Sequence, residues 1–108
     1  MEQRVLCAGR SQQIMESVLI ALRDAGYDAE GAVAIDAAVE MAARGAYDAL
    51  LVGGGITGDD RAELIERVQA VQPHIAVALV DRGPHTALEA LRTALGDADK
   101  RSAKQDLP

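Results

Sequence analysis

The sequence predicts an α/β domain, an open, doubly wound parallel sheet of about four strands with helices on both faces. Two observations lead to this fold class. Short apolar runs alternate with longer segments of helical periodicity, and Gly, Pro or Ser stands at most of the changes between them. A chain of 108 residues has room for one such domain. Because parallel strand–helix–strand units cross over in a right-handed sense, the alternation also predicts how the chain winds.

A strand and a capped helix open the chain. Val5 to Ala8 is an apolar run that predicts the first strand, and Gly9 ends it. Ser11 is suited to cap the next helix and Gly26 to end it. The stripe that we expect to face the core recurs at helical spacing and consists of Ile14, Met15, Val18, Leu19 and Leu22.

The middle of the chain repeats this pattern. Tyr27 to Val33 predicts a weak strand, diluted by Gly31, and Asp36 opens a helix that ends at Gly45. Ala49 to Val52 is apolar at every position, which is typical of parallel strands covered on both faces. We therefore expect this third strand to lie in the interior of the sheet.

The remaining elements follow in the same order. Asp59 and Asp60 favour the positive end of a third helix, which ends before Pro73. Ile75 to Val80 predicts a fourth strand and Thr86 to Leu95 a last helix. The predicted apolar face of the third helix consists of Leu64, Ile65, Val68 and Val71.

Composition sets the domain limits and excludes several classes of partner. We expect one domain at residues 1–96 and a polar, disordered tail at residues 97–108. A net charge of −6 with 2% aromatic residues argues against nucleic acid as a partner. The single cysteine favours a reducing cytoplasm, and no apolar run is long enough to span a membrane. The expected location is cytoplasmic, with no membrane contact.

Several segments resemble the receiver domain of bacterial response regulators. They are Leu22 to Asp28, Ile35 to Met41 and Tyr47 to Val52, followed at receiver-like spacing by Ile56 to Gly58 and Gln72 to Val80. The resemblance covers roughly residues 4–96. It implies a flavodoxin-like sheet and a role in two-component signalling through protein partners.

The resemblance also implies where phosphorylation chemistry would lie, and this chain departs from the receiver pattern there. The phosphoacceptor aspartate corresponds to Gly53, and the acidic pair that holds Mg²⁺ corresponds to Gly9 and Arg10. The Ser or Thr after the fourth strand corresponds to Asp81, and the fifth strand with its lysine has no counterpart. Phosphoryl transfer needs a nucleophile and charge neutralisation. The departures predict a non-catalytic, phosphorylation-independent pseudo-receiver with no metal and no cofactor.

A glycine-rich loop keeps a different function open. Gly53, Gly55 and Gly58 form a G-x-G-x-x-G pattern between a strand and a helix, the arrangement that lets backbone N–H groups approach a phosphate. Asp59 and Asp60 place negative charge where that phosphate would bind. The alternative is a small phosphate- or nucleotide-binding protein.

The lone cysteine supports a third possibility. Cys7 to Ser11 faintly resembles the phosphocysteine loop of the B components of the sugar phosphotransferase system, in which a thiolate accepts phosphate. Cys7 would have to lie in the loop and not inside the strand, where a cysteine is usually inert. A phosphocysteine carrier therefore stays open at this point.

The missing fifth strand predicts an exposed sheet edge. With nothing paired to it, the fourth strand presents free backbone groups to another chain, and we expect a homodimer through this edge, the last helix, or both. The alternative is that the last helix docks beside the first and leaves a monomer. The residues of the possible dimer edge are Ile75, Ala76, Val77, Ala78, Leu79 and Val80.

Overall fold

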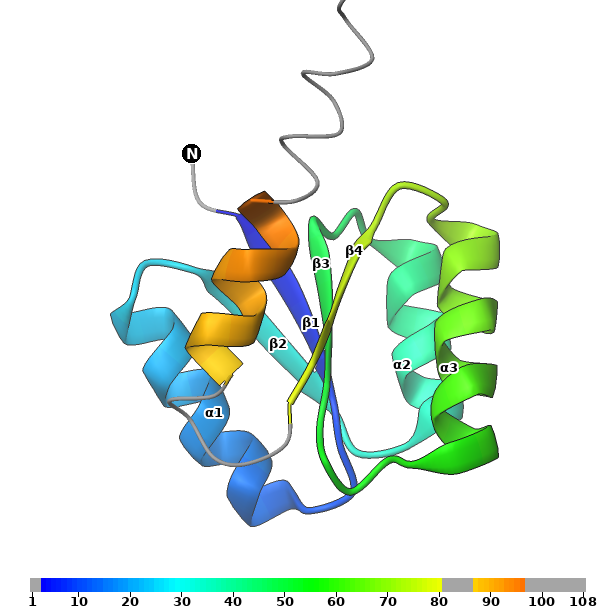
Figure 1. Cartoon of the computed structure of the whole chain (residues 1–108), viewed down its shortest axis with the longest axis horizontal. Coiled ribbons are helices and arrows are strands. Elements are labelled where there is room, and N and C mark those ends of the chain that lie inside the picture. Colours follow the sequence, from blue (N-terminus) through cyan, green and yellow to red (C-terminus); the bar gives the residue numbers. More distant parts are fainter. Residues whose placement is uncertain (1–2, 81–86, 97–108) are drawn as a thin grey trace, which may run out of the picture.

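The computed structural model describes residues 3–80 and 87–96, which form a four-stranded parallel sheet with helices on both faces (Figure 1). The strand order is β2-β1-β3-β4, which confirms the predicted fold class. Asp81 and the predicted tail at 97–108 lie outside the described residues. In chain order the elements are β1 (Arg4–Ala8), α1 (Gln12–Asp24), β2 (Asp28–Ala32), α2 (Ile35–Arg44), β3 (Ala49–Val52), α3 (Gly58–Val71), β4 (Ala76–Leu79) and a last helix at residues 87–96.

The first helix is capped as predicted but buries a different line of residues. The Ser11 side chain accepts a hydrogen bond from the Ile14 N–H at 3.3 Å. Met15, Val18 and Leu22 are the buried residues of α1, whereas Ile14 is 60% exposed. The prediction for Ile14 was wrong because Met15, Val18 and Leu22 define the centre of the buried face, and Ile14 lies on its flank.

Smaller corrections concern element ends. β2 and β4 are each one residue shorter at both ends than the predicted ranges of 27–33 and 75–80. Within 75–80, residues 75 and 80 are buried although they lie outside β4. On α3, Leu64 and Val68 face the core as expected, but Val71 in the last position is exposed.

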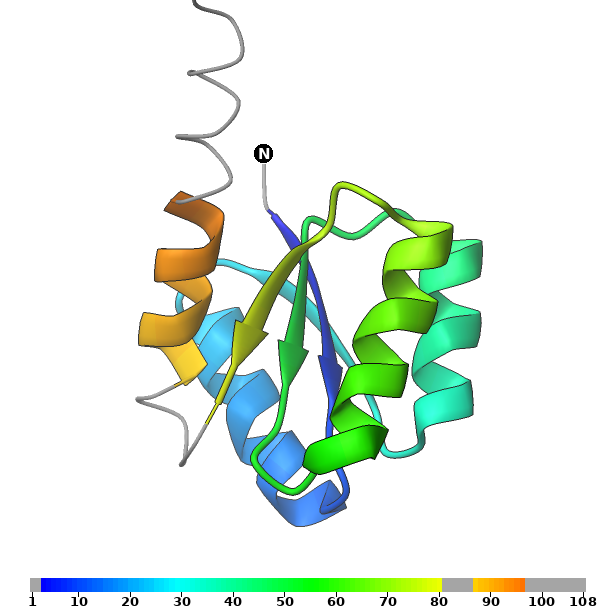
Figure 2. The same ribbon diagram turned by 45° about the vertical axis from the view of Figure 1, so that its right-hand side comes forward.

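Two apolar layers cover the two faces of the sheet. Successive residues of a strand point to opposite faces, so Cys7 packs on the α1 side and Leu6 on the side of α2 and α3. The last helix belongs to the α1 side, as Figure 2 shows, since Leu91 and Leu95 share a cluster with Met15 and its neighbours. Of the two arrangements left open for this helix, the structure has the one in which it docks on the α1 face.

The close approach of α1 to the sheet depends on a glycine in β2. A Cβ atom added at Gly31 would lie 2.7 Å from Met15 Sδ and 2.9 Å from Met15 Cγ. Gly31 also pairs in register with Cys7 of the central strand. Gly31, which makes β2 a weak strand by its sequence, is therefore the residue that lets α1 pack against the sheet.

We expect Gly31→Ala to destabilise the protein by about 1–3 kcal/mol, because the added methyl overpacks the Met15 side chain. Urea unfolding followed by circular dichroism measures the change. Gly96→Ala is the matched control, since nothing lies within 4 Å of a Cβ added there. Equal loss in both variants would show that steric overlap with Met15 is not the cause.

Candidate functional site

The candidate site lies where the carboxyl ends of β1 and β3 meet. These strands are neighbours at the point where the strand order reverses, which is where open α/β sheets bind ligands. A cavity of about 320 Å³ opens there beside α1. Its described lining is mainly apolar and includes Cys7, Ile14, Met15, Val18, Leu51 and Val80. None of the described lining residues is an aspartate or glutamate.

The two loops at this site are tied together by backbone contacts. The Gly53 N–H donates to the Ala8 carbonyl oxygen at 2.8 Å, and a Cβ atom added at Gly53 would lie 3.2 Å from that oxygen. The Gly9 N–H donates to the Ala32 carbonyl oxygen at 3.1 Å. Backbone hydrogen bonds thus hold the ends of the strands together. A side chain at position 53 would place its Cβ atom against the Ala8 carbonyl oxygen of the neighbouring strand.

Arg10 is the charged side chain of the site. Its guanidinium forms an ion pair with Asp60 in the first turn of α3. Both side chains are more than half exposed, so the pair contributes only ~0–1 kcal/mol to stability. Arg10 matters more for metal binding, because a positively charged side chain occupies the position where the receiver resemblance implies a Mg²⁺ ligand.

The geometry of the glycine-rich loop does not favour a phosphate. Two of its N–H groups are already used within the protein: Gly53 donates to Ala8, and Ile56 donates to the Gly53 carbonyl oxygen at 3.1 Å. Asp59 and Asp60 occupy the first turn of α3. A phosphate at this helix N-terminus would meet two carboxylates.

The structure contradicts the phosphocysteine alternative. Cys7 lies inside β1 and is buried. Burial raises the pKa of its thiol to about 12, against a smaller lowering by Arg23. The thiol therefore stays protonated at neutral pH, and the nucleophilic thiolate that the alternative requires is not formed.

We expect Cys7 to resist alkylation by iodoacetamide at pH 8 in the folded protein and to react fully in 6 M guanidinium, a concentration that is roughly sufficient to unfold most domains. Intact mass spectrometry measures both. Fast labelling without denaturant would mean that Cys7 is accessible and ionised, contrary to its position in β1.

Metal and membrane sites find no support in the described part of the chain. Among residues 3–80 and 87–96, no three His, Cys, Asp or Glu side chains are grouped so that they could hold a metal ion. The same residues contain no helix with the length and apolar character needed to cross a bilayer.

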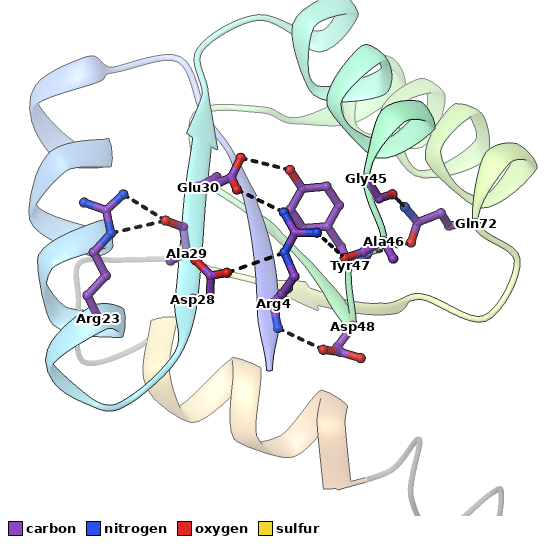
Figure 3. A network of polar contacts seen from close by, with 10 residues as sticks. All are labelled: Arg4, Arg23, Asp28, Ala29, Glu30, Gly45, Ala46, Tyr47, Asp48 and Gln72. Carbon is purple, nitrogen blue, oxygen red and sulfur yellow. Dashed lines mark hydrogen bonds and ion pairs between the residues drawn. The ribbon is translucent and has the colours of Figure 1, made fainter. Parts of the chain in front are cut away.

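Among the described residues a polar cluster lies at the amino-terminal side of the strands, and the sequence did not predict it (Figure 3). Arg4 donates to a Glu30 carboxylate oxygen at 3.0 Å, and the Tyr47 hydroxyl donates to the other at 3.1 Å. The Arg4 guanidinium also lies 4.7 Å from the centre of the Tyr47 ring. Burial and then the Glu30 carboxylate raise the pKa of Tyr47. We interpret this cluster as structural because its polar groups are directed at one another.

Gln72 connects the same region to the end of α3 (Figure 3). Its amide nitrogen donates to the carbonyl oxygens of Ala42 and Gly45, and its amide oxygen accepts from the Tyr47 N–H at 3.1 Å. One side chain therefore satisfies three backbone groups of the connection between α2 and β3. The signal in sequence was only a glutamine before Pro73.

Gln72→Glu is expected to destabilise the protein by about 1–3 kcal/mol at pH 7, since a carboxylate oxygen would face two carbonyl oxygens in place of a donor. Chemical denaturation measures the loss. Gln69→Glu, an exposed position on the same helix, controls for the added charge. A matching loss in the control would assign the effect to net charge.

Sheet order and site position together define a doubly wound α/β protein of the flavodoxin-like class. No protein-family model and no curated protein matches the sequence. Similarity to solved structures is extensive and includes several receiver domains. A CheY-like receiver domain protein from Methanospirillum hungatei JF-1 is 16% identical with a TM-score of 0.81, covering 94% of this chain and 99% of that one.

Two further solved structures agree with it. The chemotaxis protein CheY4 of Vibrio cholerae is 18% identical with a TM-score of 0.76, covering 88% of this chain and 100% of that one. The receiver domain of an HD domain-containing protein from Pseudomonas fluorescens Pf-5 is 15% identical with a TM-score of 0.75, covering 93% and 99%. The chain therefore has the receiver-domain fold, as the resemblance in sequence implied.

Proposed function

We propose that this chain is a receiver-like signalling module that acts by binding protein partners and is not switched by phosphorylation. The observation that carries the proposal is the make-up of the site at the ends of β1 and β3. Gly53 follows β3, and Arg10 is held by Asp60 beside an apolar cavity. The proposal extends to a cytoplasmic protein without enzymatic activity.

Chemistry at the site supports this proposal. A phosphoryl group needs an attacking oxygen and a divalent cation to neutralise its charge. Gly53 has no side chain to attack, and the glycine and arginine at positions 9 and 10 bring no carboxylate for a cation. Asp60 forms an ion pair with Arg10 and is engaged with it.

A binding role also agrees with the way the fold is held. The strand ends are fixed by the backbone hydrogen bonds from Gly9 to Ala32 and from Gly53 to Ala8. The charged side chain of the site, Arg10, is paired with Asp60 and not directed at a phosphoryl group. We therefore propose that the partner recognises the fold in a single state, with no phosphate-dependent change.

We expect no mass increase and no amide shifts when the protein is treated with acetyl phosphate and Mg²⁺. Intact mass spectrometry and two-dimensional NMR measure these two responses. A parallel titration with ATP, GTP and NADH tests the glycine-rich loop. Addition of a phosphoryl group would contradict the proposal, and saturable shifts confined to residues 53–60 with a nucleotide would favour a nucleotide-binding function.

A further inference from the structure

The apolar cavity beside α1 is the part of the candidate site that the proposed function leaves unused. It has a volume of about 320 Å³ and lies between α1 and the carboxyl ends of β1 and β3. Figures 1 and 2 show the last helix toward the opposite, amino-terminal ends of the strands. Among the described residues, α1 is therefore the helix that forms the wall of this cavity.

Ile14 has an exposure that the cavity explains. Met15 and Val18 line the cavity and are only 7% and 8% exposed, so they form its interior. Ile14 lines the same cavity and is 60% exposed, which places it at the mouth. An isoleucine at this position loses water contact when the cavity is occupied, and that loss favours an apolar occupant.

Polar groups around the cavity are already engaged within the protein. Arg10 is paired with Asp60, and the Ser11 hydroxyl oxygen accepts from the Ile14 N–H. The Gly53 N–H donates to the neighbouring strand. A water molecule is held in a cavity by about 2–4 polar partners, and cavities without them stay dry and take up apolar molecules. The lining therefore favours an apolar molecule over ordered water.

Charge at the rim opposes ionic ligands of either sign. Asp60 repels an anion there, as does the net charge of −6 on the chain, while the Arg10 guanidinium repels a cation. An ion of either sign would also lose its hydration on entering an apolar lining, which is unfavourable without a partner for its charge. A neutral molecule meets neither penalty.

We propose that this cavity binds a small, uncharged and mainly apolar organic molecule. Its apolar body lies against Met15, Val18 and Leu51, and Ile14 closes over it at the mouth. The site is formed before the ligand arrives, as is usual for small-molecule pockets, which are concave and mostly apolar. This inference goes beyond the proposed function, because it gives the module a ligand at the place where the receiver resemblance implies phosphorylation.

The volume of the cavity limits the size of the ligand. An apolar cavity of about 150 Å³ takes up one benzene molecule. A cavity of about 320 Å³ therefore suits a molecule of roughly a dozen non-hydrogen atoms. This size corresponds to a substituted aromatic ring or a short branched chain, and it excludes a nucleotide or a folded peptide.

NMR titration of the full-length chain with cumene, acetophenone and benzoate tests the proposal. The three compounds are alike in size and shape, and only benzoate is charged. We expect cumene and acetophenone to give saturable amide shifts confined to residues 7–18 and 51–55, with dissociation constants of about 0.1–1 mM. Benzoate is expected to bind at least tenfold more weakly, because its carboxylate has no free partner at the rim.

Ile14→Asp identifies the cavity as the site. We expect it to weaken binding of cumene at least tenfold by placing a charge at the mouth, and to leave the fold intact because Ile14 is exposed in the first turn of α1. Ile20→Asp is the matched control on the same helix, since Ile20 is also 60% exposed and is not among the described residues that line the cavity. Circular dichroism measures the folding of both variants.

Three results would overturn the proposal. They are the absence of saturable shifts with both neutral compounds, binding of benzoate as tight as that of cumene, and equal weakening by Ile14→Asp and Ile20→Asp. None of these compounds carries a phosphoryl group, so the outcome is independent of the acetyl phosphate experiment. Failure here leaves the proposed function to its own test.

Discussion

Two-sided burial of β1 is the constraint on which the rest of the structure depends. β1 pairs with β2 on one side and β3 on the other, so both neighbours take their register from it. Its side chains alternate between the two apolar layers, with Val5 and Cys7 on one face and Leu6 and Ala8 on the other. Each layer then needs helices of its own, which accounts for α1 and the last helix on one face and α2 with α3 on the other.

Features that depend on neighbouring residues in the sequence were predicted better than features that depend on residues far apart. The third strand, Ala49–Val52, was predicted to the residue because a run of four apolar residues that is followed by three glycines is too short for a helix. The position of Ile14 was wrong because periodicity gives the spacing of a stripe but not its centre. The cluster of Arg4, Glu30 and Tyr47 was missed, since its hydrogen bonds join residues 26 and 17 positions apart and no local pattern encodes them.

The candidate site shows the same division. The sequence placed Gly9, Arg10 and Gly53 at the ends of neighbouring strands, and the structure brings the two loops together. The partner of Arg10 could not be predicted, because Asp60 lies 50 positions away in the sequence. An aspartate at the start of a predicted helix is also explained by the helix dipole alone, so it gave no sign of a distant arginine. For Cys7 the deciding feature was local. Because β1 extends to Ala8, the Cys7 thiol is buried in the strand and does not lie in the loop that follows it.

The last helix explains how a sheet of this size is covered and why an edge is left. It packs Leu91 and Leu95 onto the α1 face, which completes the apolar layer over β1 and β3. That position covers β4 on the face of Ala78, while Val77 packs against the layer of α2 and α3, and among the described residues β4 pairs with β3 alone. Burial of the sheet faces and pairing of the sheet edge are separate requirements. A helix satisfies the first, whereas the backbone groups of an exposed edge are satisfied by water or by another extended chain. The last helix therefore completes the apolar layer on the α1 face without adding a strand to the sheet, which among the described residues ends at β4.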